Sequence, residues 1–190
     1  MTRVFLGLGA NVGNRTRNLL LALRLLEPQC RVVAVSSLYR SEAVVLEGQA
    51  PGPDYENAVC EVETELPPGE LLALAKEIER EIGRRPAPRW APRPIDIDIL
   101  LYGDQTSDTP ELTVPHPLLH ERGFVLAPLA ELAPEARHPV LGLSIGEIAE
   151  DADFAGLAHL AEWDAVAGAW EADEIDDDGA AERDAAPHAD

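Results

Sequence analysis

The chain has 190 residues and carries 35 acidic against 15 basic side chains, a formal net charge of −20. So acidic a chain argues against nucleic acid as a partner, because binding to a phosphate backbone needs a basic surface. One domain with an extension accounts for the length, and no apolar run approaches the roughly 20 residues that cross a bilayer.

The distribution of charge indicates where the protein works. Lys76 is the only lysine, and residues 151–190 hold 13 acids and one base. This pattern is typical of a halophilic protein in a high-salt cytoplasm, where screening weakens self-repulsion; the alternative is an ordinary acidic protein with an acidic tail. The chain opens on a strand-like run and not on a signal peptide, so we expect a cytoplasmic protein. Cys30 and Cys60 lie in apolar runs and are expected to be buried, reduced thiols.

The first half of the chain predicts two strand and helix units. Residues 3–9 form a short apolar strand, and Asn14 caps a helix that runs to about residue 26. Residues 30–37 and 57–65 have the β-branched or alternating pattern of strands. A second helix begins at Pro67 or Pro68 and ends at Gly83.

The second half begins with an irregular segment. Residues 84–94 contain four prolines, which excludes regular helix and suggests a lid. A strand at 95–102 and a helix at 123–133 follow. The order β-α-β-β-α-β predicts an α+β fold with a ferredoxin-like core and additional C-terminal helices.

From residue 151 the composition changes to alanine, aspartate and glutamate. We therefore divide the chain into a domain at 1–150 and an acidic extension at 151–190. Apolar residues at helical spacing predict an amphipathic helix to about residue 174, with disorder beyond it; these residues are Phe154, Leu157, Leu160, Trp163 and Trp170. The extension could dock on the domain, contact a partner or only maintain solubility, and no obligate protein partner is indicated.

A candidate site lies in the strand at 95–102. Asp96 and Asp98 alternate with isoleucines, so both carboxylates lie on one face, roughly 6.5 to 7 Å apart, where they repel each other unless a cation separates them. Four arginines and a tryptophan lie just upstream, at Arg84, Arg85, Arg89, Trp90 and Arg93. Carboxylates for Mg²⁺, arginines for phosphate and an aromatic face indicate a nucleoside triphosphate site. The alternative is a solvated strand face beside a basic turn.

Residues 89–100 resemble the signature of the 6-hydroxymethyl-7,8-dihydropterin pyrophosphokinase family of folate biosynthesis. Further segments resemble that family in the same order, namely residues 5–14, 36–40, 55–59, 114–116 and 122–124. The resemblance spans about residues 2–149. It implies that a pyrophosphoryl group passes from ATP, as co-substrate, to the hydroxymethyl group of the dihydropterin, with release of AMP.

The resemblance also implies roles for individual residues. Asp96 and Asp98 would hold two Mg²⁺ ions and, with Arg84 and Arg93, form the catalytic set. The residues that contact ATP would be Glu79, Arg84, Trp90, Arg93, His116 and Arg122. The residues around the pterin would be Tyr55, Asn57, Asp96 and Phe124. The amide of Asn57 offers both the donor and the acceptor that match the edge of a pterin, and an aromatic ring can stack on it.

The chain departs from this pattern at several positions. Glu111 stands where the family has a basic residue that contacts ATP, and Lys76 stands where a glutamine is familiar. The loop is about one residue shorter, so Arg85 and Arg89 have no assigned role. Two other functions stay open: another two-Mg²⁺ nucleotidyl- or phosphotransferase, and a non-catalytic ferredoxin-like binding module.

Overall fold

A seven-stranded antiparallel sheet forms the centre of the protein. The computed structural model describes residues 1–43, 52–88 and 91–171. The strands of the sheet are β1 (Thr2–Ala10), β2 (Arg31–Val35), β3 (Leu38–Ser41), β4 (Tyr55–Thr64), β5 (Asp96–Tyr102), β8 (Leu157–Asp164) and β9 (Ala169–Glu171). Their order is β5-β1-β4-β3-β8-β9, and β2 also pairs with β4. A small separate hairpin consists of β6 (Ser107–Asp108) and β7 (Thr113–Val114).

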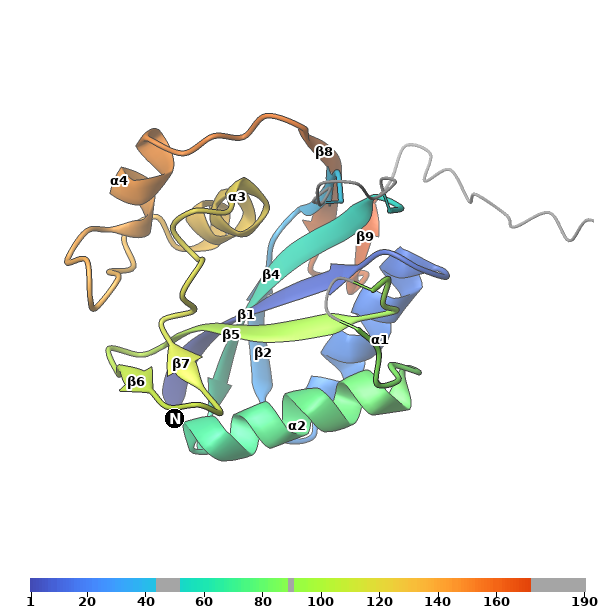
Figure 1. The fold of residues 1–190 in the computed structure, drawn as a ribbon, viewed down its shortest axis with the longest axis horizontal. Coiled ribbons are helices and arrows are strands. Elements are labelled where there is room, and N and C mark those ends of the chain that lie inside the picture. Colours follow the sequence, from blue (N-terminus) through green and yellow to red (C-terminus); the bar gives the residue numbers. More distant parts are fainter. Residues whose placement is uncertain (44–51, 89–90, 172–190) are drawn as a thin grey trace, which may run out of the picture.

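Helices cover both faces of this sheet (Figure 1). Helices α1 (Arg15–Leu26) and α2 (Pro68–Glu81) lie on one face, and α3 (Gly123–Leu132) and α4 (Ile145–Glu150) lie on the other. The predicted cap of the first helix is confirmed, since the Asn14 side chain accepts a hydrogen bond from the Arg17 N–H. No helix in the described part of the chain is long and apolar enough to cross a membrane.

Two hydrophobic cores result from the alternation of side chains along the strands. In β1, Val4, Leu6 and Leu8 pack against α1 and α2, whereas Phe5 points to the opposite face, towards α3 and α4. This alternation is what a central strand with two covered faces requires. Cys30 and Cys60 are free and buried in the first of these cores, as expected. The second core therefore determines how α3 sits above the sheet.

The C-terminal extension does not form the helix that the sequence predicts. Residues 157–164 and 169–171 form the β8–β9 hairpin, and β8 pairs with β3 at the side of the sheet. Trp170 packs against Trp163, with ring centroids 5.0 Å apart, and its indole N–H donates to the Ser36 carbonyl at 2.8 Å. The free edge of β3 offers backbone hydrogen bonds that local spacing cannot reveal, and this tertiary pairing overrides the helical periodicity. Residues 172–190 lie outside the described part of the chain.

Candidate active site

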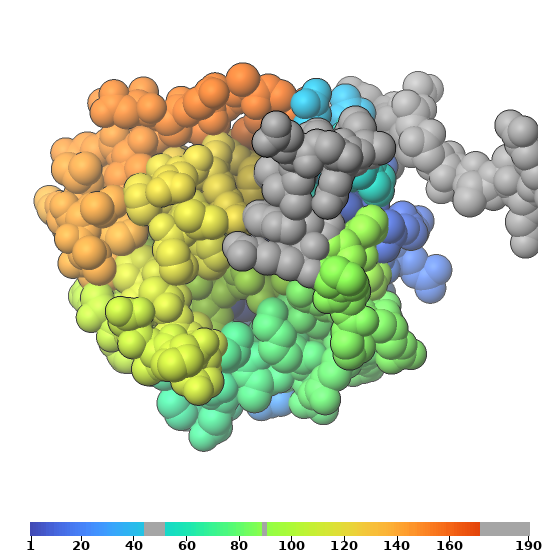
Figure 2. Space-filling view, in the orientation of Figure 1, coloured from blue at the N-terminus to red at the C-terminus, as the bar shows by residue number. Residues whose placement is uncertain are grey.

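A cavity of about 450 Å³ lies over the face of the sheet that carries α3. Figure 2 shows it as a hollow between the segments around α3 (yellow) and α2 (green). Eight of the predicted site residues line it: Tyr55, Asn57, Arg93, Asp96, Asp98, His116, Arg122 and Phe124. They come from β4, β5, the segment before β5, and the segment from β7 into α3, so the fold brings together positions up to about 70 residues apart.

Two glycines of β1 form part of the floor of the cavity. Gly7 pairs with Asp98 and Gly9 pairs with Asp96 across the β1–β5 ladder. A Cβ atom on Gly7 would lie 3.3 Å from the Leu100 side chain, and one on Gly9 would lie 3.4 Å from Asn57 Oδ1. The absence of side chains at these two positions therefore leaves space in the cavity beside both acids. Glycine commonly occurs where another group approaches a strand closely.

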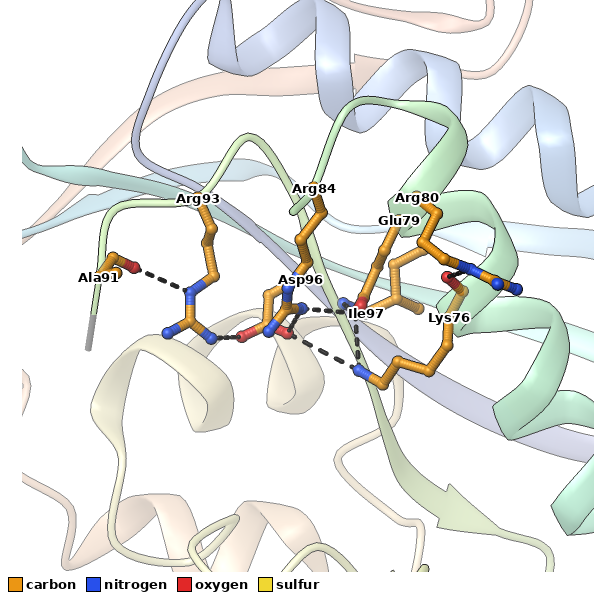
Figure 3. Close-up of polar contacts among 8 residues, drawn as sticks. All are labelled: Lys76, Glu79, Arg80, Arg84, Ala91, Arg93, Asp96 and Ile97. Atoms are coloured by element: carbon orange, nitrogen blue, oxygen red, sulfur yellow. Dashed lines mark hydrogen bonds and ion pairs between the residues drawn. The ribbon is translucent and has the colours of Figure 1, made fainter. Parts of the chain in front are cut away.

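Asp96 is held by two arginines. Arg84 Nη1 donates to Oδ1, and Arg93 Nη1 donates to Oδ2 at 2.7 Å (Figure 3). Burial raises the pKa of Asp96, but the charges of Arg84 and Arg93, the hydrogen bond from Arg84 and the charge of Lys76 outweigh burial and bring the pKa below its usual value. Asp96 is therefore an ionised carboxylate whose two oxygens are both paired.

Asp98 has the opposite electrostatic environment. Burial, followed by repulsion from Asp96, raises the pKa of Asp98 above its usual value. An added cation beside the two acids would relieve this repulsion.

The donor set fits Mg²⁺. The cation commonly binds proteins through one or two carboxylates and completes its shell with water and substrate phosphate. The described residues contain no cluster of three or more acidic, histidine or cysteine ligands that would suggest a metal cage. Carboxylate oxygens alone suit a hard cation, and the two acids on one strand face supply them.

Glu79 lies behind Asp96 and does not line the cavity. Its Oε1 accepts hydrogen bonds from the Ile97 N–H at 2.9 Å and from Lys76 Nζ at 2.7 Å, and pairs with Arg84 Nη1 at 2.8 Å. Burial raises the pKa of Glu79, while Lys76 and the Ile97 N–H oppose the shift. The structure thus places Glu79 as a link between α2 and β5, and the ATP contact that the resemblance implies for it stays a prediction.

Two polar residues that the sequence did not single out hold the walls of the cavity. Asn11 accepts a hydrogen bond from the Arg93 N–H at 2.7 Å, and its own N–H donates to the Arg93 carbonyl at 3.1 Å. Ser41 Oγ accepts from Asn57 Nδ2 at 2.9 Å, which fixes the Asn57 amide. Only the position of Asn11 inside the family-like segment 5–14 could have signalled its role.

His116 and Arg122 form the side of the cavity next to α3. The His116 N–H donates to the Leu100 carbonyl at 2.9 Å, and Nδ1 accepts from the Leu118 N–H at 3.2 Å. In the neutral ring the proton is therefore on Nε2. Burial, and then the charge of Arg122, lowers the pKa of His116. The Arg122 guanidinium lies 5.7 Å from the centre of the Phe124 ring.

Other predicted residues lie elsewhere. Arg84 contacts Asp96 from the side of α2 and does not line the cavity. Lys76 Nζ lies 3.9 Å from Asp96 Oδ1, and Glu111 is exposed. Arg89 and Trp90 lie outside the described residues.

Two acids on one strand face, with arginines on one of them and a cavity in front, are parts that phosphate-transferring enzymes use for positioning and charge stabilisation. The family model of 7,8-dihydro-6-hydroxymethylpterin-pyrophosphokinase (HPPK) matches residues 5–134. The chain belongs to this family. It is a pyrophosphokinase, which transfers a pyrophosphoryl group from ATP to hydroxymethyldihydropterin in folate synthesis.

Curated relatives support this family. The chain is 43% identical over 140 residues to the 2-amino-4-hydroxy-6-hydroxymethyldihydropteridine pyrophosphokinase of Aquifex aeolicus, covering 74% of this chain and 86% of the relative. It is 41% identical over 160 residues to the enzyme of the same name from Pseudomonas aeruginosa, covering 83% and 96%.

Solved structures show the same fold. An HPPK-DHPS structure in complex with substrates matches with a TM-score of 0.66 at 12% identity, covering 90% of this chain and 48% of that chain. Wild-type Plasmodium falciparum HPPK-DHPS with SDX-DHP matches with a TM-score of 0.63 at 15% identity, covering 90% and 49%. The chain thus spans about half the length of these two-part proteins.

Proposed function

We propose that Asp96 and Asp98 hold two Mg²⁺ ions and that ATP and 6-hydroxymethyl-7,8-dihydropterin bind together in the cavity. The observation that carries this assignment is the acid pair, which lies on the cavity face of β5 beside two glycines and two arginines. The hydroxymethyl oxygen attacks the β-phosphorus and loses its proton to water, the bond from that phosphorus to the α,β-bridging oxygen breaks, and AMP leaves. Bound Mg²⁺ would neutralise phosphate charge and lower the pKa of the substrate hydroxyl.

The pterin half of the cavity is assigned to Tyr55, Asn57 and Phe124. Because Ser41 holds one N–H of the Asn57 amide, the amide oxygen has a fixed direction and can accept from a pterin N–H. The two rings offer flat apolar surfaces to a flat ligand. The low floor at Gly7 and Gly9 leaves room for the bicycle next to Asp96 and Asp98.

The phosphate half is assigned to Arg84, Arg93, His116 and Arg122. Without ligand, Arg84 and Arg93 occupy one lone pair on each oxygen of Asp96, and the remaining lone pairs are open to a metal. We assign the two arginines to the phosphates once ATP binds. Phosphate oxygens are their natural new partners, because guanidinium groups pair with phosphate as they do with carboxylate. The neutral His116 can donate its Nε2–H to phosphate or ribose.

Two broader features complete the proposal. The strand order β5-β1-β4-β2 with two helices on one face supports the description of the core as ferredoxin-like. The net charge of −20 with a single lysine supports a protein adapted to a high-salt cytoplasm.

The test is an assay in concentrated KCl with ATP, Mg²⁺ and 6-hydroxymethyl-7,8-dihydropterin. AMP should form only when the pterin is present, and chelation of Mg²⁺ should stop its formation. Asp96→Ala should lower kcat by at least about 10³-fold, whereas Asp104→Ala, which removes an exposed acid beyond the same strand, should not. Release of pyrophosphate in place of AMP would indicate a nucleotidyltransferase, and binding of ATP without any turnover would indicate a binding module.

A further inference from the structure

Glu79 is a buried acid with two cationic groups and a backbone N–H around one oxygen. Only 2% of the residue is exposed, and Oε1 contacts Lys76, Arg84 and the Ile97 N–H at 2.7 to 2.9 Å. Removing the positive partner of a buried carboxylate is strongly destabilising, because the charge is then uncompensated. Glu79 therefore keeps its charge only while a cation remains beside it.

Arg84 is shared between two acids. Its Nη1 contacts both Glu79 and Asp96 (Figure 3). Its backbone N–H donates to the Glu79 carbonyl at 2.9 Å, so the end of α2 anchors the main chain and only the side chain is free to change partners. When Arg84 transfers to phosphate, Glu79 loses one of its two cationic partners.

Lys76 is the cation that can remain beside Glu79 when Arg84 moves. It lies one turn before Glu79 on α2, and its Nζ reaches Glu79 at 2.7 Å while remaining 3.9 Å from Asp96. We propose that Lys76 is a positioning residue that keeps Glu79 compensated while Arg84 moves to the phosphates of ATP. This inference rests on the proposed function, because it requires ATP phosphates within reach of Arg84.

A direct role for Lys76 makes a different prediction. If the ammonium group itself contacted phosphate, its removal would weaken ATP binding whether or not Glu79 carried a charge. If Lys76 acts through Glu79, its removal matters only while Glu79 is an acid. A double-mutant cycle separates the two cases.

The experiment measures binding of a Mg²⁺-loaded ATP analogue, with a methylene group between the α and β phosphorus atoms, to the full chain by calorimetry in concentrated KCl. Lys76→Met should weaken binding by about tenfold, because Arg84 then remains bound to Glu79. In a Glu79→Gln background the same change should weaken binding by less than about twofold. Lys76→Arg, which keeps the cation, should bind like the wild type.

Arg80→Met is the matched control, since it removes a cation one turn further along α2. Within residues 1–43, 52–88 and 91–171, the polar contact of Arg80 Nε is with the Lys76 carbonyl. Thermal unfolding of each variant shows whether a change in affinity merely follows a loss of stability. An equal loss of affinity in both backgrounds, or no loss in either, would overturn the inference and leave the proposed function intact. Failure of the wild type to bind the analogue would overturn the ATP assignment, and the inference with it.

Discussion

At the scale of single residues, two acids on the same face of one strand have opposite electrostatic environments. Asp96 is compensated by two arginines, whereas burial and the charge of Asp96 disfavour the ionised form of Asp98. The protein without ligand therefore stores electrostatic strain at Asp98 that binding of a cation would release. Under the proposed metal assignment, the repulsion that a cation would relieve lowers stability when no cation is bound.

Asp98→Asn should therefore stabilise the protein and inactivate it. At neutral pH and with a chelator present, removal of the carboxylate removes its repulsion from Asp96, so Tm should rise by a few degrees. Calorimetric melts with and without Mg²⁺ test this prediction, with Asp104→Asn as the control. A lower Tm for Asp98→Asn in the chelator would contradict the electrostatic account.

His116 should make stability depend on pH. Its pKa in the folded protein lies below the ordinary value of 6.5, mainly because of burial. A depressed pKa favours the neutral ring in the fold, so the associated stability is present above pH 6.5 and is lost as pH falls through the folded pKa. His116→Gln should therefore lose less stability than the wild type between pH 7.5 and pH 5, measured by urea unfolding; an identical loss would contradict it.

At the scale of elements, the β8–β9 hairpin shows what local pattern can and cannot predict. The helices at 15–26 and 68–81 and the strands at 2–10 and 55–64 follow from periodicity, because each buries one regular stripe or face. The apolar residues from Phe154 to Trp163 also fit a helix, yet β8 pairs with β3. The deciding partner is a strand more than 110 residues earlier, which no local window contains.

Trp170 should contribute strongly to stability. It is 6% exposed, packs on Trp163 and donates to the Ser36 carbonyl. Trp170→Ala should lower the free energy of unfolding by about 3 kcal/mol, and Trp170→Phe by about 1 kcal/mol, for the lost hydrogen bond. Urea unfolding measures both, and Val166→Ala in the exposed hairpin turn is the control. Values near zero would mean that the hairpin is not docked on β3 in solution.

The residues of the site also differ in whether local sequence pattern could predict them. The acids at 96 and 98 and the nearby arginines follow from local alternation and charge, whereas Tyr55, Asn57 and Phe124 follow only from resemblance to a family. Gly7 and Gly9 could not be recognised as the floor of the cavity, because their role depends on their register with β5. The burial of Glu79 depends on how α2 packs, and its predicted contact with ATP stays a prediction.

At the scale of the whole molecule, the net negative charge affects stability. With a net charge of −20 on 190 residues, repulsion between acids opposes the compact state. Raising KCl from about 0.1 M to about 1 M shortens the Debye length from roughly 10 Å to roughly 3 Å. Tm should rise markedly over this range. Sucrose, which stabilises folded proteins without screening charge, serves as the comparison, and an unchanged Tm in KCl would contradict the high-salt adaptation.

The burial of both cysteines has a practical consequence. Burial raises the pKa of Cys60 to about 12 and also raises that of Cys30, so neither thiol forms the thiolate that reacts with a maleimide at neutral pH. A cysteine introduced by Ala91→Cys, beside Arg93, would therefore be the one thiol open to a fluorescent dye in the described part of the chain. The two native cysteines therefore need not be replaced before a single dye is attached next to the cavity to follow ligand binding by fluorescence.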